Sequence, residues 1–177
     1  MTTDADAIFI LGNRDPDAPP SCLISWCGQD WVADVKHVRS TALDLMTCAA
    51  YADMLLHLTL QLGIDPSTAG GFAGSLIYTQ TGRQSFGSAH TISLLPVGST
   101  RQRMSAVRIT RGRLSGLVTA AEAREMSLVW LSAAEAAESD QVVAEALRAV
   151  GRLDEDRVEQ VFTYMRELRS SGEADHD

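Results

Sequence analysis

A long run of good helix formers constrains the fold of this chain more than any other feature. The run occupies residues 41–62 after Ser40, and Gly63 followed by Pro66 supplies a stop signal. From Leu55 onward, apolar residues cover nearly the whole circumference of this helix, which is typical of a helix buried at the centre of a fold. We therefore expect the other elements to pack around it.

Short apolar segments before this helix predict β-strands. Residues 7–11 and 22–27 are expected to form a hairpin with a long connection that is rich in Asp and Pro. Residues 31–38 fit either a strand or an early helical turn. The sequence assigns no structure to residues 65–88, because glycines at positions 70, 71 and 74 weaken the helix that Asp65 could cap there.

A second set of strands is expected after residue 89. Residues 90–119 predict an antiparallel meander, in which the first strand ends at Pro96 and a tight turn around Gly112 joins the last two. Side chains alternate along a strand, so Arg108 faces the side opposite to its two apolar neighbours.

The C-terminal part predicts helices. Thr119 and Glu122 form a capping-box pattern, in which each side chain accepts a hydrogen bond from the other residue's backbone. Ser139 and Asp140 are expected to interrupt this helix, and Asp154 is expected to cap a last one. The apolar stripe of that last helix comprises Val158, Val161, Phe162, Met165 and Leu168.

Together these elements predict one α+β domain over residues 1–169. It consists of a small, mostly antiparallel sheet packed on a long central helix, with a helical C-terminal region. The length of 177 residues suits a single domain that buries its core without disulfides. The polar residues 170–177 are expected to be a disordered tail.

Charge is distributed unevenly along the chain. Between Asp65 and Glu122 there is no acidic residue, whereas both flanking parts are strongly acidic. The candidate binding residues are the arginines in or beside the predicted meander: Arg101, Arg103, Arg108, Arg111 and Arg113. Their counterpart is a protein partner, the acidic helices of the same chain or of a second copy, a nucleic acid, or a small anion.

The acidic balance of the whole chain orders these alternatives. A pI of about 4.9 argues against general nucleic-acid binding and against anionic membranes. Residues 87–129 also lack aromatic side chains on which bases would stack. We therefore expect a protein partner, with a nucleic-acid-binding regulator that uses the arginine-rich hairpin of residues 101–113 as the alternative.

Cysteine usage and the apolar pattern predict a cytoplasmic protein that does not span a membrane. The cysteines are three in number, and the N-terminal residues lack the pattern of a secretory leader. The longest apolar stretch is interrupted by His57 and other polar residues, so it is not expected to cross a bilayer.

A metal site is disfavoured by ligand spacing. Cys22, Cys27 and His37 could supply three zinc ligands, and a fourth would come from Cys48 or His57. Positions 22 and 27 face opposite sides of a regular strand, however, so buried structural thiols are expected and neither a metal nor another cofactor.

Catalytic chemistry is also disfavoured, and no catalytic residue is assigned. Residues 71–75 and 85–90 contain Ser and His but lack the Gly-x-Ser-x-Gly nucleophile pattern. His57 is expected to be a hydrogen-bonded core histidine. Trp26 and Trp31 could line a pocket or anchor an interface, but we expect them to pack the first hairpin onto the long helix.

The segment from Leu117 to Glu138, a strand followed by an Ala- and Glu-rich helix, resembles a segment of small uncharacterised actinobacterial and actinobacteriophage proteins. The resemblance implies a provenance and no activity. The sequence therefore predicts a non-enzymatic interaction protein that acts through a surface. The apolar stripe of the last helix further predicts a homodimer.

Overall fold

The computed structural model describes residues 8–13, 18–81, 86 and 92–173. Two three-stranded antiparallel sheets alternate with two pairs of helices, which confirms the predicted α+β class with two small sheets in place of one. The first half contains β1 (Ile8–Asn13), β2 (Ser21–Trp26), β3 (Gln29–Asp34), α1 (Val35–Leu60) and α2 (Pro66–Thr81). The second half contains β4 (Ser93–Ser99), β5 (Met104–Arg111), β6 (Leu114–Thr119), α3 (Ala120–Ala149) and α4 (Glu155–Glu173).

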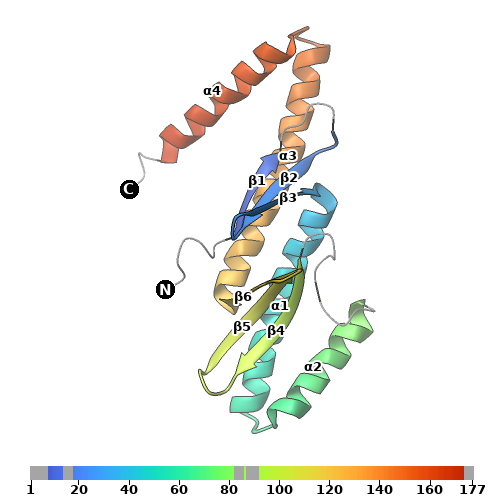
Figure 1. Cartoon of the computed structure of the whole chain (residues 1–177), viewed down its shortest axis with the longest axis vertical. Helices are drawn as coiled ribbons and strands as arrows, with labels where there is room; N and C mark the ends of the chain where they lie inside the picture. Colours follow the sequence, from blue (N-terminus) through green and yellow to red (C-terminus); the bar gives the residue numbers. More distant parts are fainter. Residues whose placement is uncertain (1–7, 14–17, 82–85, 87–91, 174–177) are drawn as a thin grey trace.

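The long helices α1 and α3 run side by side, and both sheets lie against this helical layer (Figure 1). The shorter helices α2 and α4 project at opposite ends of the molecule. Each sheet packs mainly on the long helix of the other half, because β1 and β2 contact α3 while β4 and β5 contact α1. One hydrophobic core, built from residues of both halves, therefore holds the molecule together.

The two halves repeat the same structure. Both sheets have the strand order of the sequence, and β2 pairs with β3 in the same register as β5 with β6. Ile24 faces Trp31 in the first sheet, and Ile109 faces Gly116 in the second, so the two units are offset by 85 residues at these strands. The chain is an internal duplication of a unit with three strands followed by two helices.

The long helices continue the repeat at the same offset. Their N-cap residues, Asp34 and Thr119, correspond to each other. The buried positions of α1 that recur on α3 are Val35, Val38, Ala42, Leu45, Ala49 and Ala52, matched by Ala120, Ala123, Ser127, Trp130, Ala134 and Ala137. The hydroxyl of Ser127 donates to the carbonyl of its own counterpart, Ala42, at 2.7 Å, so equivalent points of the two helices meet there.

Ion pairs between the long helices show that the halves are related by an approximate two-fold rotation. Arg39 of α1 pairs with Glu138 of α3, and Arg124 of α3 pairs with Asp53 of α1. At the offset of 85, Arg39 corresponds to Arg124 and Asp53 corresponds to Glu138. Each pair therefore becomes the other when the halves are exchanged, which is the property of a two-fold axis.

The second helices of the two units also correspond, at an offset of 89. The offset rises from 85 to 89 because α3 has 30 residues and α1 has 26, a difference of about one helical turn. Gly63 and Arg152 both have a positive φ, of 65° and 51°, where the chain leaves the long helix. The side chains of Asp65 and Asp154 then both accept backbone hydrogen bonds at the start of the next helix, which confirms the predicted cap at Asp154.

The central helix differs from its prediction at both ends. It begins at Val35, and residues 29–34 before it form β3, a strand that the sequence pattern left open. At the other end, His57, Leu60 and Leu62 are exposed, so the expectation of central burial from Leu55 onward is wrong there. The elements that contact α1, which include α2, α3, β4 and β5, leave these side chains uncovered in the described structure.

Two predicted interruptions are absent from the described helices and strands. The strand β4 passes through Pro96, which is tolerated because β4 is an edge strand and the nitrogen at this position points away from β5. The helix α3 passes through Ser139 and Asp140, which cost only tenths of a kcal/mol in a helix interior. Burial of Ala137 and Ala144 on either side offsets that cost.

Residues 65–88, to which the sequence assigns no structure, contain α2. Glycines within it cost about 1 kcal/mol each relative to alanine. Its helical structure comes from Asp65, which caps it, and from Ala69 and Ala73, which pack against Leu55 of α1. At the other end of the chain α4 continues to Glu173, beyond the point where a disordered tail was expected to start.

Among the described helices, α1 has the length and composition to cross a membrane. The core helix of a soluble protein can have the same length and composition. In this structure α1 packs on α3 and on β4 and β5. Its Asp53 forms an ion pair with Arg124 of α3. These contacts place one face of α1 inside the fold.

Candidate functional site

An apolar groove of about 290 Å³ lies where the end of the first sheet meets the free edge of the second. One wall consists of four consecutive residues of β6, residues 115–118. The others come from the first sheet, from β5 and from the start of α3. The remaining lining residues are Ile8, Trp26, Cys27, Ile109, Glu122 and Met126.

Beside the groove the two units differ at two pairs of equivalent positions. In the first unit Trp31 fills the space, and the guanidinium carbon of Arg111 lies over its ring at 3.9 Å from the centroid. The counterparts of these residues are Gly116 and Trp26. A Cβ on Gly116 would come within 3.2 Å of Cζ2 of Trp26, so the Trp26 ring takes the place of a side chain at position 116.

The edge of β6 that borders the groove has unused hydrogen-bonding groups. A two-residue turn closes the β5–β6 hairpin, so Arg111 and Leu114 beside it form a hydrogen-bonded pair. Every second pair of an antiparallel ladder is hydrogen-bonded, so Gly116 and Val118 also bond to β5. The backbone N–H and C=O of Ser115 and Leu117 therefore point away from β5. Neither residue has a backbone partner beyond the sheet in the described part of the chain. The groove thus follows an unpaired strand edge.

The five candidate arginines surround the second sheet. Arg101, Arg103, Arg108 and Arg113 are exposed, and Arg111 is partly buried on Trp31. The predicted facing of Arg108 is confirmed, because its neighbours Val107 and Ile109 lie in the core. Within the described ranges, none of the five forms an ion pair.

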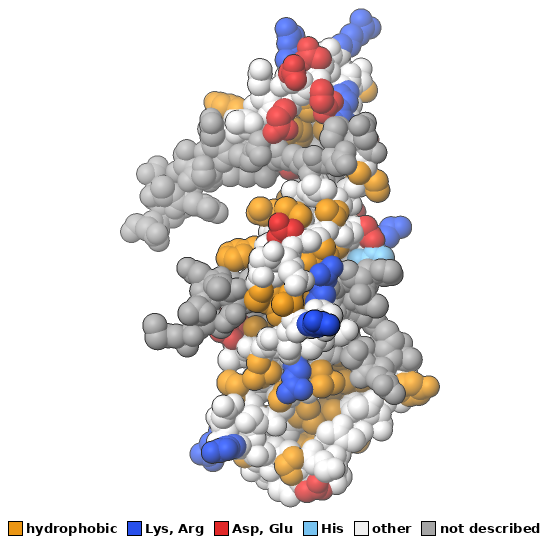
Figure 2. Space-filling model, in the orientation of Figure 1, with side chains coloured by type: hydrophobic (Ala, Val, Ile, Leu, Met, Phe, Trp, Pro, Cys, Tyr) orange, Lys and Arg blue, Asp and Glu red, His pale blue; other side chains and the backbone are white. Residues whose placement is uncertain are grey.

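Carboxylates of the acidic helices have other partners. Glu135 and Glu138 both accept hydrogen bonds from Arg39, and Glu155 accepts them from Arg148. The bond from Arg39 lowers the pKa of Glu138, and the bond from Arg148 lowers the pKa of Glu155. In the described structure the hairpin arginines are therefore not neutralised by α3 or α4. Figure 2 shows basic and hydrophobic side chains over the strands and many of the acidic ones at the α3–α4 end.

The residues proposed as alternative metal ligands lie in different environments. Cys22 is fully buried on the core face of β2, whereas Cys27 is exposed in the β2–β3 turn with a φ of 49°. The imidazole of His37 contacts the carboxylate of Asp34 on the helix cap. The described residues contain no group of three or more His, Cys, Asp or Glu placed to hold a metal ion.

Thiol labelling at pH 7.5 is expected to separate the cysteines. Burial raises the pKa of Cys22 to about 11 and that of Cys48 to about 12, so neither forms a thiolate in the native protein. Iodoacetamide should modify Cys27 alone in the native state and all three cysteines in denaturant, as counted by mass spectrometry. Rapid native labelling of Cys48 would contradict the buried environment described for it.

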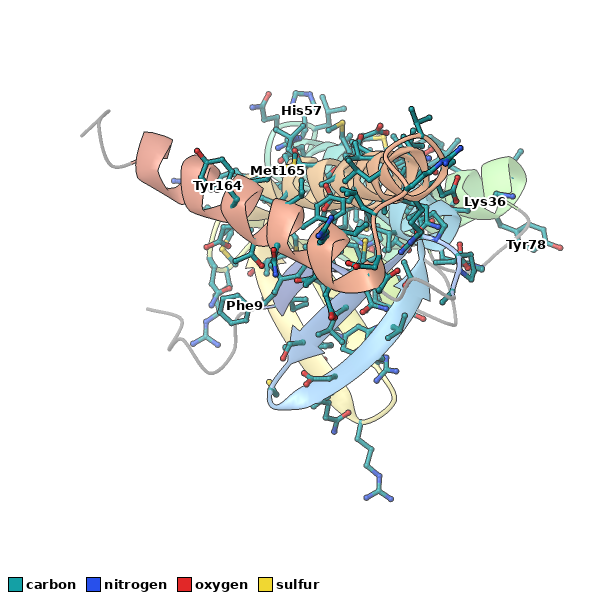
Figure 3. All side chains as sticks on the ribbon, turned by 90° about the horizontal axis from the view of Figure 1, so that it is seen from above. Phe9, Lys36, His57, Tyr78, Tyr164 and Met165 are labelled. Atoms are coloured by element: carbon teal, nitrogen blue, oxygen red, sulfur yellow. The ribbon has the colours of Figure 1, made fainter. Side chains whose placement is uncertain are left out.

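Only part of the candidate set for nucleophilic catalysis lies in the described part of the chain. Ser75 donates to the carbonyl of Gly71 within α2, whereas Ser85, Ser88 and His90 lie outside the described residues. His57 is exposed on α1 and lies on the helical side of the molecule, away from the strands (Figure 3). The expectation of a core histidine is therefore wrong, because none of the described elements covers this face of α1 at His57.

Sequence reasoning named Trp26 as a residue that could line a pocket, and Trp26 does line the groove, but the sequence did not indicate that the groove lies along β6. The ring of Trp26 lies against the backbone of β6 at Gly116. The alignment of the two units is the signal that could have located this site, since it places a glycine opposite Trp31. Few identical residues mark the repeat, among them Ile24 with Ile109 and Arg39 with Arg124.

A second cavity, between α3 and α4, offers less space. Its volume is about 50 Å³, enough for one or two water molecules. The ion pair of Arg148 with Glu155 lies at this cavity, and the nearby Val158 and Phe162 are buried against α3. It therefore belongs to the packing of α4 on the body of the protein.

No protein-family model matches the chain, and neither a curated protein nor a solved structure matches it. The function is therefore assigned from the geometry of the groove and of the strand edge beside it.

Proposed function

We propose that this protein is a non-enzymatic binding protein that accepts an extended segment of another polypeptide along β6. The observation that carries the proposal is the groove wall formed by residues 115–118, an edge strand whose outward backbone groups have no backbone partner among the described residues. A segment bound there would become a fourth strand of the second sheet. Main-chain hydrogen bonds would supply affinity, and the groove would select its alternate side chains.

The groove suits a side chain of moderate size. Its walls are largely apolar, with Trp26, Ile109 and Met126 among them. Burying a Leu-sized side chain there would contribute about 1.5–3 kcal/mol. The hydrogen bonds of Ser115 and Leu117 would add about 0.5–1.5 kcal/mol each. Such sums fit a reversible interaction once the entropy of ordering the segment is subtracted.

A second copy of the chain is a poorer occupant of this edge. Pairing two β6 strands about a two-fold axis would bring two arginine-rich hairpins together, and no acidic residue lies between Asp65 and Glu122 to compensate. The stripe on which a homodimer was predicted is also partly used, since Val158 and Phe162 are buried against α3 of the same chain. The homodimer remains a prediction.

Nucleic acid is the second candidate, favoured by the exposed, unpaired arginines of the hairpin. Replacing Arg108, Arg111 and Arg113 by alanine should then weaken DNA binding and flatten its salt dependence by close to one unit per lost phosphate contact. A wild-type protein that shifts neither duplex nor single-stranded DNA in physiological salt excludes this candidate.

The peptide-binding proposal is tested with a phage-displayed library of short random peptides selected on the wild-type protein. The diagnostic variant is Leu117→Pro, which removes an outward N–H of β6 without removing a ladder bond. The matched control is Val32→Pro, because Val32 is the counterpart of Leu117 on the edge strand β3, which borders no such groove.

Selected peptides are expected to bind the wild type and Val32→Pro alike and to lose at least tenfold in affinity for Leu117→Pro. Circular dichroism and the melting temperature establish that both variants keep the fold. Peptides that bind Leu117→Pro as tightly as the wild type, or a selection that enriches no peptide, would refute the proposal.

A further inference from the structure

The position of the unpaired arginines relative to β6 restricts the chemistry of the segment. We infer that the partner segment alternates apolar and acidic residues, with the apolar side chains in the groove and the acidic ones on the outer face of the second sheet. This inference rests on the proposed function and specifies its ligand.

The alternation follows from the register of the sheet. Along β6, Gly116 and Val118 face the core side, while Ser115 and Leu117 face the outer side. A strand added beside β6 has the same pleat, so alternate residues enter the groove and the others lie beside Leu117 on the outer face. A regular extended ligand therefore requires two different kinds of side chain with a period of two.

The outer face is where the arginines are within reach. Arg108 of β5 lies directly opposite Leu117, on the same face. Strands are about 4.8 Å apart, so a residue of the added strand opposite Leu117 would lie roughly 10 Å from Arg108 between Cα atoms. A glutamate and an arginine side chain span that distance together. Arg113 lies in the turn at the end of the same edge and is exposed.

Other carboxylates do not compete for these arginines in the described structure. Residues 66–121 contain no acidic residue, and the nearest acidic side chain in sequence, Glu122, is held by the Thr119 cap. The chain as a whole carries a net charge of −8. That charge repels an acidic ligand only weakly beyond about 8 Å at physiological salt, so the local arginines determine the preference.

The test uses synthetic peptides in which Leu or Val alternates with Glu, compared with peptides of the same apolar residues that carry Gln or Lys in place of Glu. Fluorescence anisotropy gives the affinity of each for the full-length protein. The diagnostic variant is the double replacement Arg108→Gln and Arg113→Gln. The control is Arg157→Gln, an equally exposed arginine of α4.

The Glu peptide is expected to bind about tenfold more tightly than the Gln peptide, since each exposed ion pair contributes a few-fold at most. The preference should disappear in the double variant and persist in Arg157→Gln. Equal affinity of the Glu, Gln and Lys peptides, each still sensitive to Leu117→Pro, would overturn the acidic ligand and leave the strand edge as the binding site. Binding of the Glu peptide that is insensitive to Leu117→Pro, or no binding at all, would overturn both.

Discussion

Replacing Trp130 by alanine is expected to lower the free energy of unfolding by about 3–5 kcal/mol. Trp130 is fully buried on α3 within the core that both halves share. Its counterpart Leu45 on α1 is fully buried in the same core, and Leu45→Ala is expected to cost about 2–5 kcal/mol. Either loss approaches the whole stability of a marginal domain, because folded domains are typically stable by only about 5–15 kcal/mol.

Urea denaturation followed by circular dichroism measures these losses. Trp130→Phe is a useful second variant, because Nε1 of Trp130 is buried without a hydrogen-bond partner in the described structure. Removing that N–H relieves a desolvation cost of about 1–3 kcal/mol, which offsets part of the lost volume. Leu128→Ala is the surface control, since this side chain is 59% exposed and should change stability by about 0.5 kcal/mol or less. Equal losses for Trp130→Ala and Leu128→Ala would contradict the packing described here.

Local signals in the sequence predicted the local structure. The capping box of Thr119 and Glu122 is present, with both reciprocal hydrogen bonds formed. The tight turn at Gly112 and the facing of Arg108 also agree with the structure. Each of these depends on residues within a few positions of one another, where backbone sterics and side-chain alternation leave few alternatives.

The duplicated architecture could not be derived from the same signals. The reciprocal pairs Arg39–Glu138 and Arg124–Asp53 join residues that are far apart in the sequence, and neither pair has a local pattern. Buried positions keep their spacing in the two units but not their identity, as Leu45 and Trp130 show. A core tolerates such exchanges when the total volume is kept, so the fold shows the repeat clearly although few identical residues mark it in the sequence.

One such exchange lies at the binding groove. Gly116 occupies the position of Trp31, and a glycine in a strand is usually taken as a weak point of the strand. A glycine fits this position because Trp26 approaches the β6 backbone from the other sheet. That approach is a tertiary contact, so the sequence of β6 alone does not indicate the groove.

A truncated chain that ends at residue 81 is expected not to fold as a monomer. In the intact protein the first sheet packs mainly on α3, and the buried face of α1 is covered by α3, β4 and β5. Without the second half, core residues such as Ile24, Val38 and Leu45, all fully buried in the intact protein, would be exposed to water. Each loses about 1.5–3 kcal/mol of burial, and three such losses remove most of the stability of a small domain.

Co-expression of residues 1–81 with residues 82–177 is expected to restore the fold. The ion pairs and the shared core connect the two fragments without requiring the peptide bond between them. Size-exclusion chromatography and circular dichroism would show a one-to-one complex with a cooperative melting transition. A monomeric fragment of residues 1–81 that melts cooperatively on its own would contradict the shared core.

The same fragments show why each half of the protein pairs with the other half and not with a second copy of itself. Each fragment could in principle pair with itself, since Arg39 could meet Asp53 of a second copy of the first fragment, as it meets Glu138 here. Packing opposes this, because Trp26 would then meet Trp31 where it now meets Gly116.

In a self-pair of the second fragment, Arg111 would meet Gly116 and lose its contact with the Trp31 ring. Two copies of Trp130 would also occupy the space that Leu45 and Trp130 share, which is an overpacking that typically costs about 1–3 kcal/mol. Differently tagged fragments mixed in equal amounts should therefore form the mixed pair in large excess over either self-pair. A statistical mixture of the three would mean that the exchange of Trp31 for Gly116 does not contribute to the pairing of the halves.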